Sequence, residues 1–170
     1  SEVNSIRRAV PGRESRLVQV RTDILILGSG IGGLTLALRC AEFADVVIVT
    51  KKDRSESNTN YAQGGIAAAL GEDDRLELHE RATLACGAGI CDPEAVRVLV
   101  EEGPGEIAHL LSLGVRFDRD PDLPGLLALG REGGHSRRRI VHSKDRTGRA
   151  IETVLLKLAQ GHRKITILEN

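Results

Sequence analysis

The sequence is poor in aromatic residues and has no excess of either charge. Aromatic side chains make up 2% of its 170 residues, and 24 basic residues balance 24 acidic ones. Single-stranded nucleic acid is bound largely by stacking on aromatic side chains, and anionic surfaces attract a net positive charge. No apolar run in the sequence approaches the roughly 20 residues of a membrane-spanning helix. The composition therefore predicts neither nucleic acid nor a membrane as a partner.

Methionine is absent and cysteine is scarce. The chain begins at Ser1 without any methionine, which predicts a processed or excerpted chain. Its three cysteines, Cys40, Cys86 and Cys91, are an odd set that fits a reducing compartment better than a disulfide framework. No metal-ligand pattern surrounds them, so we expect no metal site. Cys86 and Cys91 are expected to be small buried hydrophobic residues.

The N-terminal residues differ in character from the rest of the chain. Residues 1–20 are polar and rich in arginine, without the apolar segment of a secretory signal. We expect a flexible tail over residues 1–20. Residues 21–170 are expected to form the N-terminal part of one larger domain, whose core must be built from leucine, isoleucine, valine and alanine because aromatic residues are so few.

The domain opens with an apolar run that leads into a glycine cluster. Residues 23–27 have the length and continuity of a parallel strand buried on both faces. The cluster Gly28-Ser29-Gly30-Ile31-Gly32-Gly33 follows, then an expected helix over residues 34–43 and a second buried strand over residues 46–50. This order predicts a right-handed parallel βαβ unit, and therefore an α/β, Rossmann-like fold.

The rest of the chain alternates loops, helices and short strands. Asp92 and Pro93 are typical of the N-cap and first position of a helix. Because the last element is a strand with no helix after it, we expect an incomplete sheet. The expected elements are a polar binding loop over residues 51–65, helices over 74–88 and over 93–113 with an interruption at 103–105, a strand at 115–117, a loop over 118–134, a strand at 139–142, a helix over 147–160 capped by Thr147, and a strand at 165–168.

The glycine cluster matches the dinucleotide-binding pattern G-x-G-x-x-G through Gly28, Gly30 and Gly33. Its glycines permit a tight turn, close approach to a pyrophosphate and contact between helix and strand, and the helix N-terminus favours phosphate. The acidic residue expected at the end of the second strand is replaced by Thr50, Lys51 and Lys52. A lysine there favours the 2′-phosphate of NADP. Alternatively, Thr50 and Lys51 contact the adenosine end of another dinucleotide, or both lysines are solvated surface residues. The local residues leave these three alternatives open.

Two further segments resemble a known family. The segment Ser57-Asn58-Thr59-Asn60-Tyr61-Ala62-Gln63-Gly64-Gly65-Ile66 resembles the flavin-contacting segment of the succinate dehydrogenase/fumarate reductase flavoprotein superfamily. Residues 131–136, with the sequence Arg-Glu-Gly-Gly-His-Ser, and residues 88–92 resemble one branch of it, the L-aspartate oxidases. The resemblance runs from Asp23 to the C-terminus, with three separated motifs in the right order.

The resemblance implies a glutathione reductase-type FAD fold that holds FAD without a covalent bond. In the respiratory members a histidine bonds covalently to the flavin, and the matching position here is Asn58. Backbone N–H groups near the flavin would stabilise its reduced, negatively charged form. The cofactor-binding residues implied by the resemblance are Gly28, Ser29, Gly30, Ile31, Gly32, Gly33, Lys51, Asn58, Thr59, Asn60, Tyr61, Ala62, Gln63, Gly64 and Gly65.

The resemblance also implies substrate residues. Glu132 matches a glutamate that helps to orient L-aspartate, and the alternative is a surface carboxylate paired with Arg131. His135 is expected beside flavin, substrate or their supporting residues, and it is a weak general-base candidate because no carboxylate orients it. The basic run from Arg137 to Arg149 is expected to be a solvated face, with the steering of a dicarboxylate as the alternative.

The implied function is oxidation of L-aspartate to iminosuccinate by hydride transfer from the α-carbon to flavin N5. The electron acceptor would be O₂ or fumarate, and the product would pass to quinolinate synthase in cytoplasmic NAD biosynthesis. A capping domain beyond Asn170 supplies a catalytic arginine in the superfamily, so we expect this chain alone to be nearly inactive. The alternatives are a fumarate reductase-like enzyme with noncovalent FAD, a non-catalytic nucleotide-binding fragment, and an NADP-binding module.

Overall fold

The computed structural model describes residues 19–51, 57–144 and 146–169. The chain forms two compact units, one containing residues up to 56 together with residues 156–170, and the other containing residues 57–155. The expected tail over residues 1–20 lies almost entirely outside the described residues. It remains a prediction, as does the grouping of residues 21–170 into one domain.

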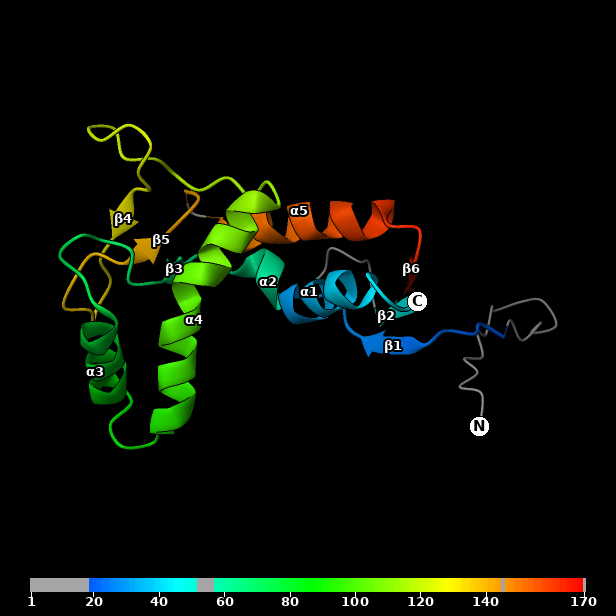
Figure 1. Cartoon of the computed structure of the whole chain (residues 1–170), viewed down its shortest axis with the longest axis horizontal. Coiled ribbons are helices and arrows are strands. Elements are labelled where there is room, and N and C mark those ends of the chain that lie inside the picture. The colour runs from blue at the N-terminus through cyan, green and yellow to red at the C-terminus, as the bar shows by residue number, and fades with distance from the viewer. Residues whose placement is uncertain (1–18, 52–56, 145, 170) are drawn as a thin grey trace. The chain divides into compact units, whose positions relative to one another are not determined.

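The first unit contains the predicted βαβ arrangement (Figure 1). Strand β1 (Ile24–Leu27), helix α1 (Ile31–Cys40) and strand β2 (Val46–Thr50) follow one another, and the final strand β6 (Ile165–Glu169) returns to the same sheet. The strands are parallel in the order β1-β2-β6, with Ile24 opposite Val46 and Val46 opposite Ile165. The α/β class and the parallel sheet are thus confirmed.

The two strands of the βαβ unit differ in burial. In β2, Val46, Val47 and Ile48 are at most 3% exposed, as expected for a strand covered on both faces. The same expectation is wrong for β1, where Leu25 is 38% and Leu27 is 79% exposed. Ile26 lies on the opposite face of β1 and is 6% exposed, because that face meets α1.

The second unit is built on a small antiparallel sheet. Its strands β3 (Ile66–Ala67), β4 (Leu129–Gly130) and β5 (Ile140–Val141) lie in the order β3-β5-β4. The strand expected at 139–142 is therefore confirmed as β5, whereas residues 115–117 form no strand. Val115 and Phe117 are buried nevertheless, so the apolar pattern there marks core residues of a loop.

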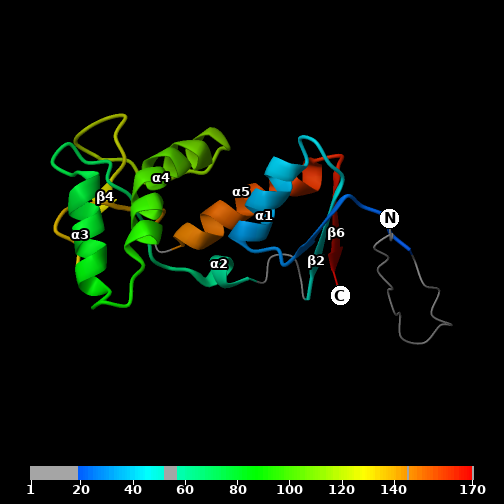
Figure 2. The same cartoon turned by 60° about the horizontal axis from the view of Figure 1, so that its bottom comes forward.

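Helices complete the second unit. They are α2 (Asn58–Tyr61), α3 (Leu76–Cys86), α4 (Pro93–Ser112) and most of α5 (Thr147–Gly161). Helices α3 and α4 pack side by side (Figure 2). None of the helices in the described ranges is long and apolar enough to cross a membrane.

The predicted start of α4 is confirmed and its predicted interruption is wrong. Asp92 Oδ1 accepts hydrogen bonds from the backbone N–H groups of Glu94 at 2.9 Å and Ala95 at 3.2 Å. The helix then continues through Pro104 to Ser112, and its axis changes direction along its length (Figure 2). Pro104 removes one backbone donor, but buried apolar residues before and after it, Val100 and Ile107, hold both halves of α4 in the core.

Two smaller expectations also require correction. Thr147 is the first residue of α5 rather than its cap, and its Oγ1 accepts a hydrogen bond from Ser143 N at 3.1 Å. Cys86 ends α3 and is exposed, so it is not the buried hydrophobic residue that we expected. Cys40 is buried and Cys91 is partly buried.

Candidate functional site

The glycine loop of the first unit joins β1 to α1. Its geometry shows why glycine is needed at two of the three motif positions, Gly28 and Gly33. Gly28 has φ +104°, a backbone conformation that favours glycine. A Cβ on Gly33 would lie 2.2 Å from the carbonyl oxygen of Gly28, so helix and loop approach too closely for any side chain. Gly30 is the N-cap of α1, and no side chain caps the helix there. The N-terminus of α1, with its positive dipole end, therefore lies at the loop where a phosphate would bind.

The end of β2 lies beside this loop. Ser29 Oγ donates a hydrogen bond to Thr50 Oγ1 at 3.1 Å, and both residues are buried. This bond joins the glycine loop to the end of the neighbouring parallel strand, the place where α/β sheets bind ligands. Lys51 follows and is exposed, while Lys52 lies outside the described residues.

The expected flavin segment lies in the second unit and is held by two close backbone approaches. A Cβ on Gly65 would lie 2.3 Å from Ile140 Cγ2 and 2.5 Å from the carbonyl oxygen of Val141, both in β5. A Cβ on Gly148 would lie 1.9 Å from the carbonyl oxygen of Thr59, and Gly148 N donates to the Ala62 carbonyl at 3.2 Å. Gly65 is thus required by packing on β5, a role that the sequence did not indicate.

Glu152 of α5 anchors the start of the same segment. Its side chain is buried, and Ser57 Oγ donates a hydrogen bond to Glu152 Oε1. The second oxygen, Oε2, is buried without a hydrogen-bond partner. Burial raises the pKa of the Glu152 carboxyl, against the opposing effect of the Ser57 hydrogen bond. Sequence reasoning missed both Gly148 and Glu152, which follow the loop motif by about 90 residues.

The motif turn, residues 131–136, brings Glu132 to the flavin segment. Arg131 Nε donates to the carbonyl oxygen of His135 at 2.9 Å, and His135 N donates to the carbonyl oxygen of Glu132 at 3.3 Å. Arg131 thus binds the turn backbone. The Glu132 side chain is exposed, and a Cβ on Gly64 would lie 3.9 Å from its Oε1. A carboxylate that faces solvent therefore lies beside a glycine of the flavin segment.

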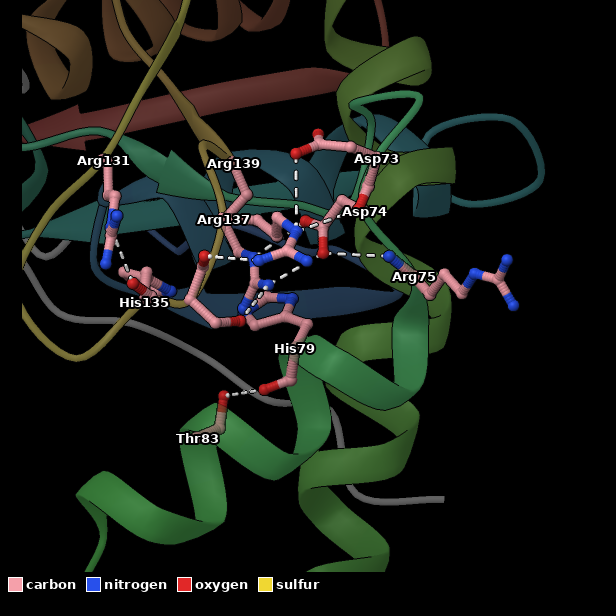
Figure 3. A network of polar contacts seen from close by, with 10 residues as sticks. Asp73, Asp74, Arg75, His79, Thr83, Arg131, His135, Arg137 and Arg139 are labelled. Atoms are coloured by element: carbon pink, nitrogen blue, oxygen red, sulfur yellow. Dashed lines mark hydrogen bonds and ion pairs between the residues drawn. The ribbon is translucent and has the colours of Figure 1, made fainter.

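The basic run after this turn does not form one face. Arg139 is fully buried and makes a bidentate ion pair with Asp74, with Nε to Oδ2 and Nη2 to Oδ1 both at 2.8 Å (Figure 3). Arg137 Nε donates to the backbone carbonyl of Asp73 at 3.1 Å. Arg139 therefore belongs to the core, and the expectation of a solvated or steering face is wrong for it. Three other basic residues, Lys144, Arg146 and Arg149, line a cavity of about 480 Å³ with Arg116.

Two histidines pack beside this ion pair. His79 of α3 is 2% exposed, and its ring centroid lies 5.8 Å from that of His135. The Nδ1 atoms of both rings are buried without a hydrogen-bond partner. Burial lowers the pKa of His79, and the nearby Arg139 and His135 lower it further, against a smaller opposing effect of Asp74. Within the described part of the chain, no group of His, Cys, Asp or Glu side chains could hold a metal ion.

The predicted cofactor residues thus fall into two groups. Gly28, Ser29, Gly30, Ile31, Gly32, Gly33 and Lys51 belong to the first unit, and residues 58–65 belong to the second together with Glu132 and His135. Within the second unit the structure brings Glu132 next to Gly64. The assignment of each residue to cofactor or substrate remains a prediction.

The sequence matches the family model described as FAD binding domain over residues 23–170. The chain belongs to this FAD binding domain family. The described residues fit the cofactor, because Gly28 has a backbone conformation that favours glycine, Gly33 has no room for a side chain, and the N-terminus of α1 follows this loop directly. FAD is therefore the cofactor of this fold, and the match gives no support to an NADP-binding module.

Individual relatives and solved structures show which proteins with this domain the chain resembles. The chain is 46% identical over 145 residues to a chloroplastic L-aspartate oxidase of Oryza sativa subsp. japonica, which covers 85% of the chain and 22% of the relative. It is 46% identical over 150 residues to an L-aspartate oxidase of Vibrio cholerae, covering 86% of the chain and 28% of the relative. An E. coli quinol fumarate reductase structure matches with TM-score 0.80 and 29% identity, covering 86% of this chain and 25% of that one. The chain spans about a quarter of the length of these proteins.

Proposed function

We propose that this chain provides the FAD-binding part of an L-aspartate oxidase. One observation carries the proposal beyond the family: the Glu132 carboxylate lies next to Gly64 of the flavin segment, with 3.9 Å between Oε1 and a Cβ placed on Gly64. An amino acid bound by Glu132 through its ammonium group would have its α-carbon near the flavin. The 46% identity to L-aspartate oxidases from a plant and a bacterium supports the same substrate.

The residues of this chain would bind and orient the reactants. L-Aspartate loses two electrons and two protons and becomes iminosuccinate, and FAD, when bound, takes up the electrons and passes them to O₂ or fumarate. The glycine loop and the α1 N-terminus would hold the pyrophosphate, and the segment over residues 58–65 would surround the flavin. Glu132 would pair with the substrate ammonium, and Asn58 offers no imidazole for a covalent flavin bond.

The cellular role follows from the chemistry of the product. Iminosuccinate hydrolyses readily, so an enzyme that condenses it, such as quinolinate synthase, would have to consume it promptly. We place the reaction in NAD biosynthesis and in the cytoplasm. The chain covers about a quarter of its relatives, so we expect the 170 residues alone to bind FAD with little or no oxidase turnover.

The first test is the visible absorbance spectrum of the purified chain after incubation with FAD, recorded before and after denaturation. We expect a flavin spectrum whose chromophore separates from the denatured chain on filtration. Chromophore that stays on the denatured chain would contradict the noncovalent assignment. A chain that binds ADP but no FAD would instead favour a non-catalytic nucleotide-binding module.

A second candidate is a fumarate reductase-like enzyme, favoured by the TM-score of 0.80 to a quinol fumarate reductase. Activity assays on the intact enzyme that carries this sequence distinguish the two candidate functions. An L-aspartate oxidase releases peroxide from L-aspartate in the presence of O₂, and Glu132→Gln is expected to raise its KM about tenfold or more, the loss of one charged pair. Reduction of fumarate by a reduced dye, with no peroxide from L-aspartate, would establish the second candidate.

A further inference from the structure

The motif turn that carries Glu132 rests on one face of α3. His135 lies against His79, with ring centroids 5.8 Å apart and planes inclined by 57°. A Cβ on Gly134 would lie 2.3 Å from Cys86 Sγ, so Gly134, the residue before His135, also lies against α3. Positions 79 and 86 are seven residues apart and share a helix face. The turn is therefore supported at two points, of which His79 is the buried one.

The buried Asp74–Arg139 ion pair acts electrostatically on His79. The charged and titratable groups that act on it are Arg139, His135 and Asp74. Both Asp74 oxygens accept hydrogen bonds from Arg139, so Asp74 has little capacity left to stabilise a proton on His79. A second positive charge beside the buried guanidinium would be costly. The imidazole of His79 is therefore neutral near pH 7, and a neutral ring can pack against the His135 ring.

We propose that His79 is a positioning residue for Glu132: its imidazole supports the His135 ring and thereby fixes the turn that presents Glu132 to the substrate. One hydrogen bond joins His135 to Glu132 directly, from His135 N to the Glu132 carbonyl, and a second, from Arg131 Nε to the His135 carbonyl, holds the His135 backbone to the residue before Glu132. A shift of His135 would therefore be passed to the backbone of the turn at Glu132. The proposal rests on the proposed function, because it assumes that Glu132 binds the substrate.

The direction of the pH effect follows from the environment of His79. Its pKa lies below the usual value of about 6.5, so the ring stays neutral until the pH falls below that value. Protonation then places a charge beside Arg139 and displaces the ring. Substrate binding should therefore weaken on the acid side of pH 6.5 through His79.

The test compares His79→Ala, His79→Phe and the control His109→Ala in the intact FAD-loaded enzyme. His109 is partly buried on the neighbouring helix α4 and far in sequence from the turn. We expect His79→Ala to raise the KM for L-aspartate about tenfold, with kcat and FAD affinity changed less than about threefold, because substrate binding is weakened equally in the ground state and the transition state. His79→Phe should keep the KM near pH 7.5 within about threefold and lose the acid-side rise that His79 causes.

Two results would overturn the proposal. One is an unchanged KM in both His79 variants. The other is a loss of FAD affinity and thermal stability that parallels the change in KM, because a merely structural role would affect all three. If a His79 variant fails to fold, His79→Gln replaces it, since glutamine is neutral at every pH used.

A second readout separates this proposal from the proposed function. Amide hydrogen-exchange protection of residues 132–135, measured in the FAD-loaded wild type at pH 7.5 and pH 5.5, should fall at the lower pH, and the fall should be absent in His79→Phe. If Glu132→Gln leaves the KM for L-aspartate unchanged, the substrate role of Glu132 fails, and the exchange data alone decide the role of His79. If Glu132→Gln raises the KM and neither His79 variant affects KM or exchange, only the role of His79 fails.

Discussion

Among the described residues of the second unit, Asp74 and Glu152 both have buried carboxylates, and their partners differ. Asp74 accepts hydrogen bonds from two nitrogens of Arg139 and from the backbone N–H of Arg75, so both of its oxygens are paired. Glu152 accepts one hydrogen bond from Ser57, and its Oε2 is buried without a partner. Arg139 Nη2 also donates a hydrogen bond to Ser136 Oγ of the motif turn at 3.4 Å, whereas Glu152 binds Ser57, at the start of the flavin segment.

The difference separates a fixed structural charge from a group that changes its charge more easily. An ion pair with all carboxylate oxygens bound is retained because removing either partner leaves a buried charge. A half-paired carboxylate instead becomes easier to protonate, and burial does raise the pKa of Glu152. We therefore expect substitutions around Asp74 to affect stability at every pH near neutrality, and substitutions at Glu152 to act in a pH-dependent way.

The largest effect is expected from breaking the Asp74–Arg139 pair. Arg139→Met leaves the Asp74 carboxylate buried without its cation, and should lower the free energy of unfolding by about 3–5 kcal/mol. The double variant Asp74→Leu/Arg139→Met removes both charges and should recover most of this loss. Urea denaturation followed by circular dichroism would measure both values.

The matched control for this pair is Arg137→Met. The Arg137–Asp73 ion pair has side chains that are 43% and 74% exposed, so its loss should cost less than about 1 kcal/mol. Equal losses of unfolding free energy in Arg137→Met and Arg139→Met would show that the burial of the Asp74–Arg139 pair has no energetic consequence. Asp74 would then not differ from an exposed carboxylate in its effect on stability.

A smaller effect is expected at Gly148, one turn before Glu152 on α5. Gly148→Ala would force its Cβ to within 1.9 Å of the Thr59 carbonyl, so α5 and the flavin segment must separate, at a cost of about 1–3 kcal/mol. FAD affinity should fall as well, measured by quenching of flavin fluorescence. Gly161→Ala, at the end of the same helix and with open space around its Cβ, should leave both stability and FAD affinity close to wild type. Wild-type FAD binding in Gly148→Ala would show that the segment tolerates the displacement.

The two carboxylates also show which features of the structure the sequence could not predict. The βαβ unit, the Asp92 cap of α4 and strand β5 were predictable, because each depends on a local pattern of a few residues. Arg139 was assigned to a basic run because its neighbours in sequence are basic. Its partner Asp74 lies 65 positions away, so the local sequence does not reveal the ion pair. Ser57 and Glu152 are 95 positions apart. No local spacing indicates such pairs, and the exposure of Leu27 likewise depends on which face of the sheet is covered.

The smallest effect on stability is expected from Glu152→Gln. It tests most directly whether Glu152, unlike Asp74, contributes to stability in a pH-dependent way. Because the pKa of Glu152 is raised in the folded chain, its folded form binds a proton more tightly than the unfolded form does. The contribution of Glu152 to stability is therefore complete below the unfolded pKa of about 4.5, and is lost as the pH rises through the folded pKa. Glutamine keeps an oxygen for Ser57 and cannot ionise. Relative to wild type, Glu152→Gln should therefore be more stable at pH 7, an advantage that disappears as the pH falls to 4. Urea denaturation of both proteins at the two pH values measures this difference, and an advantage that is equal at pH 4 and pH 7 would show that Glu152 does not titrate between them.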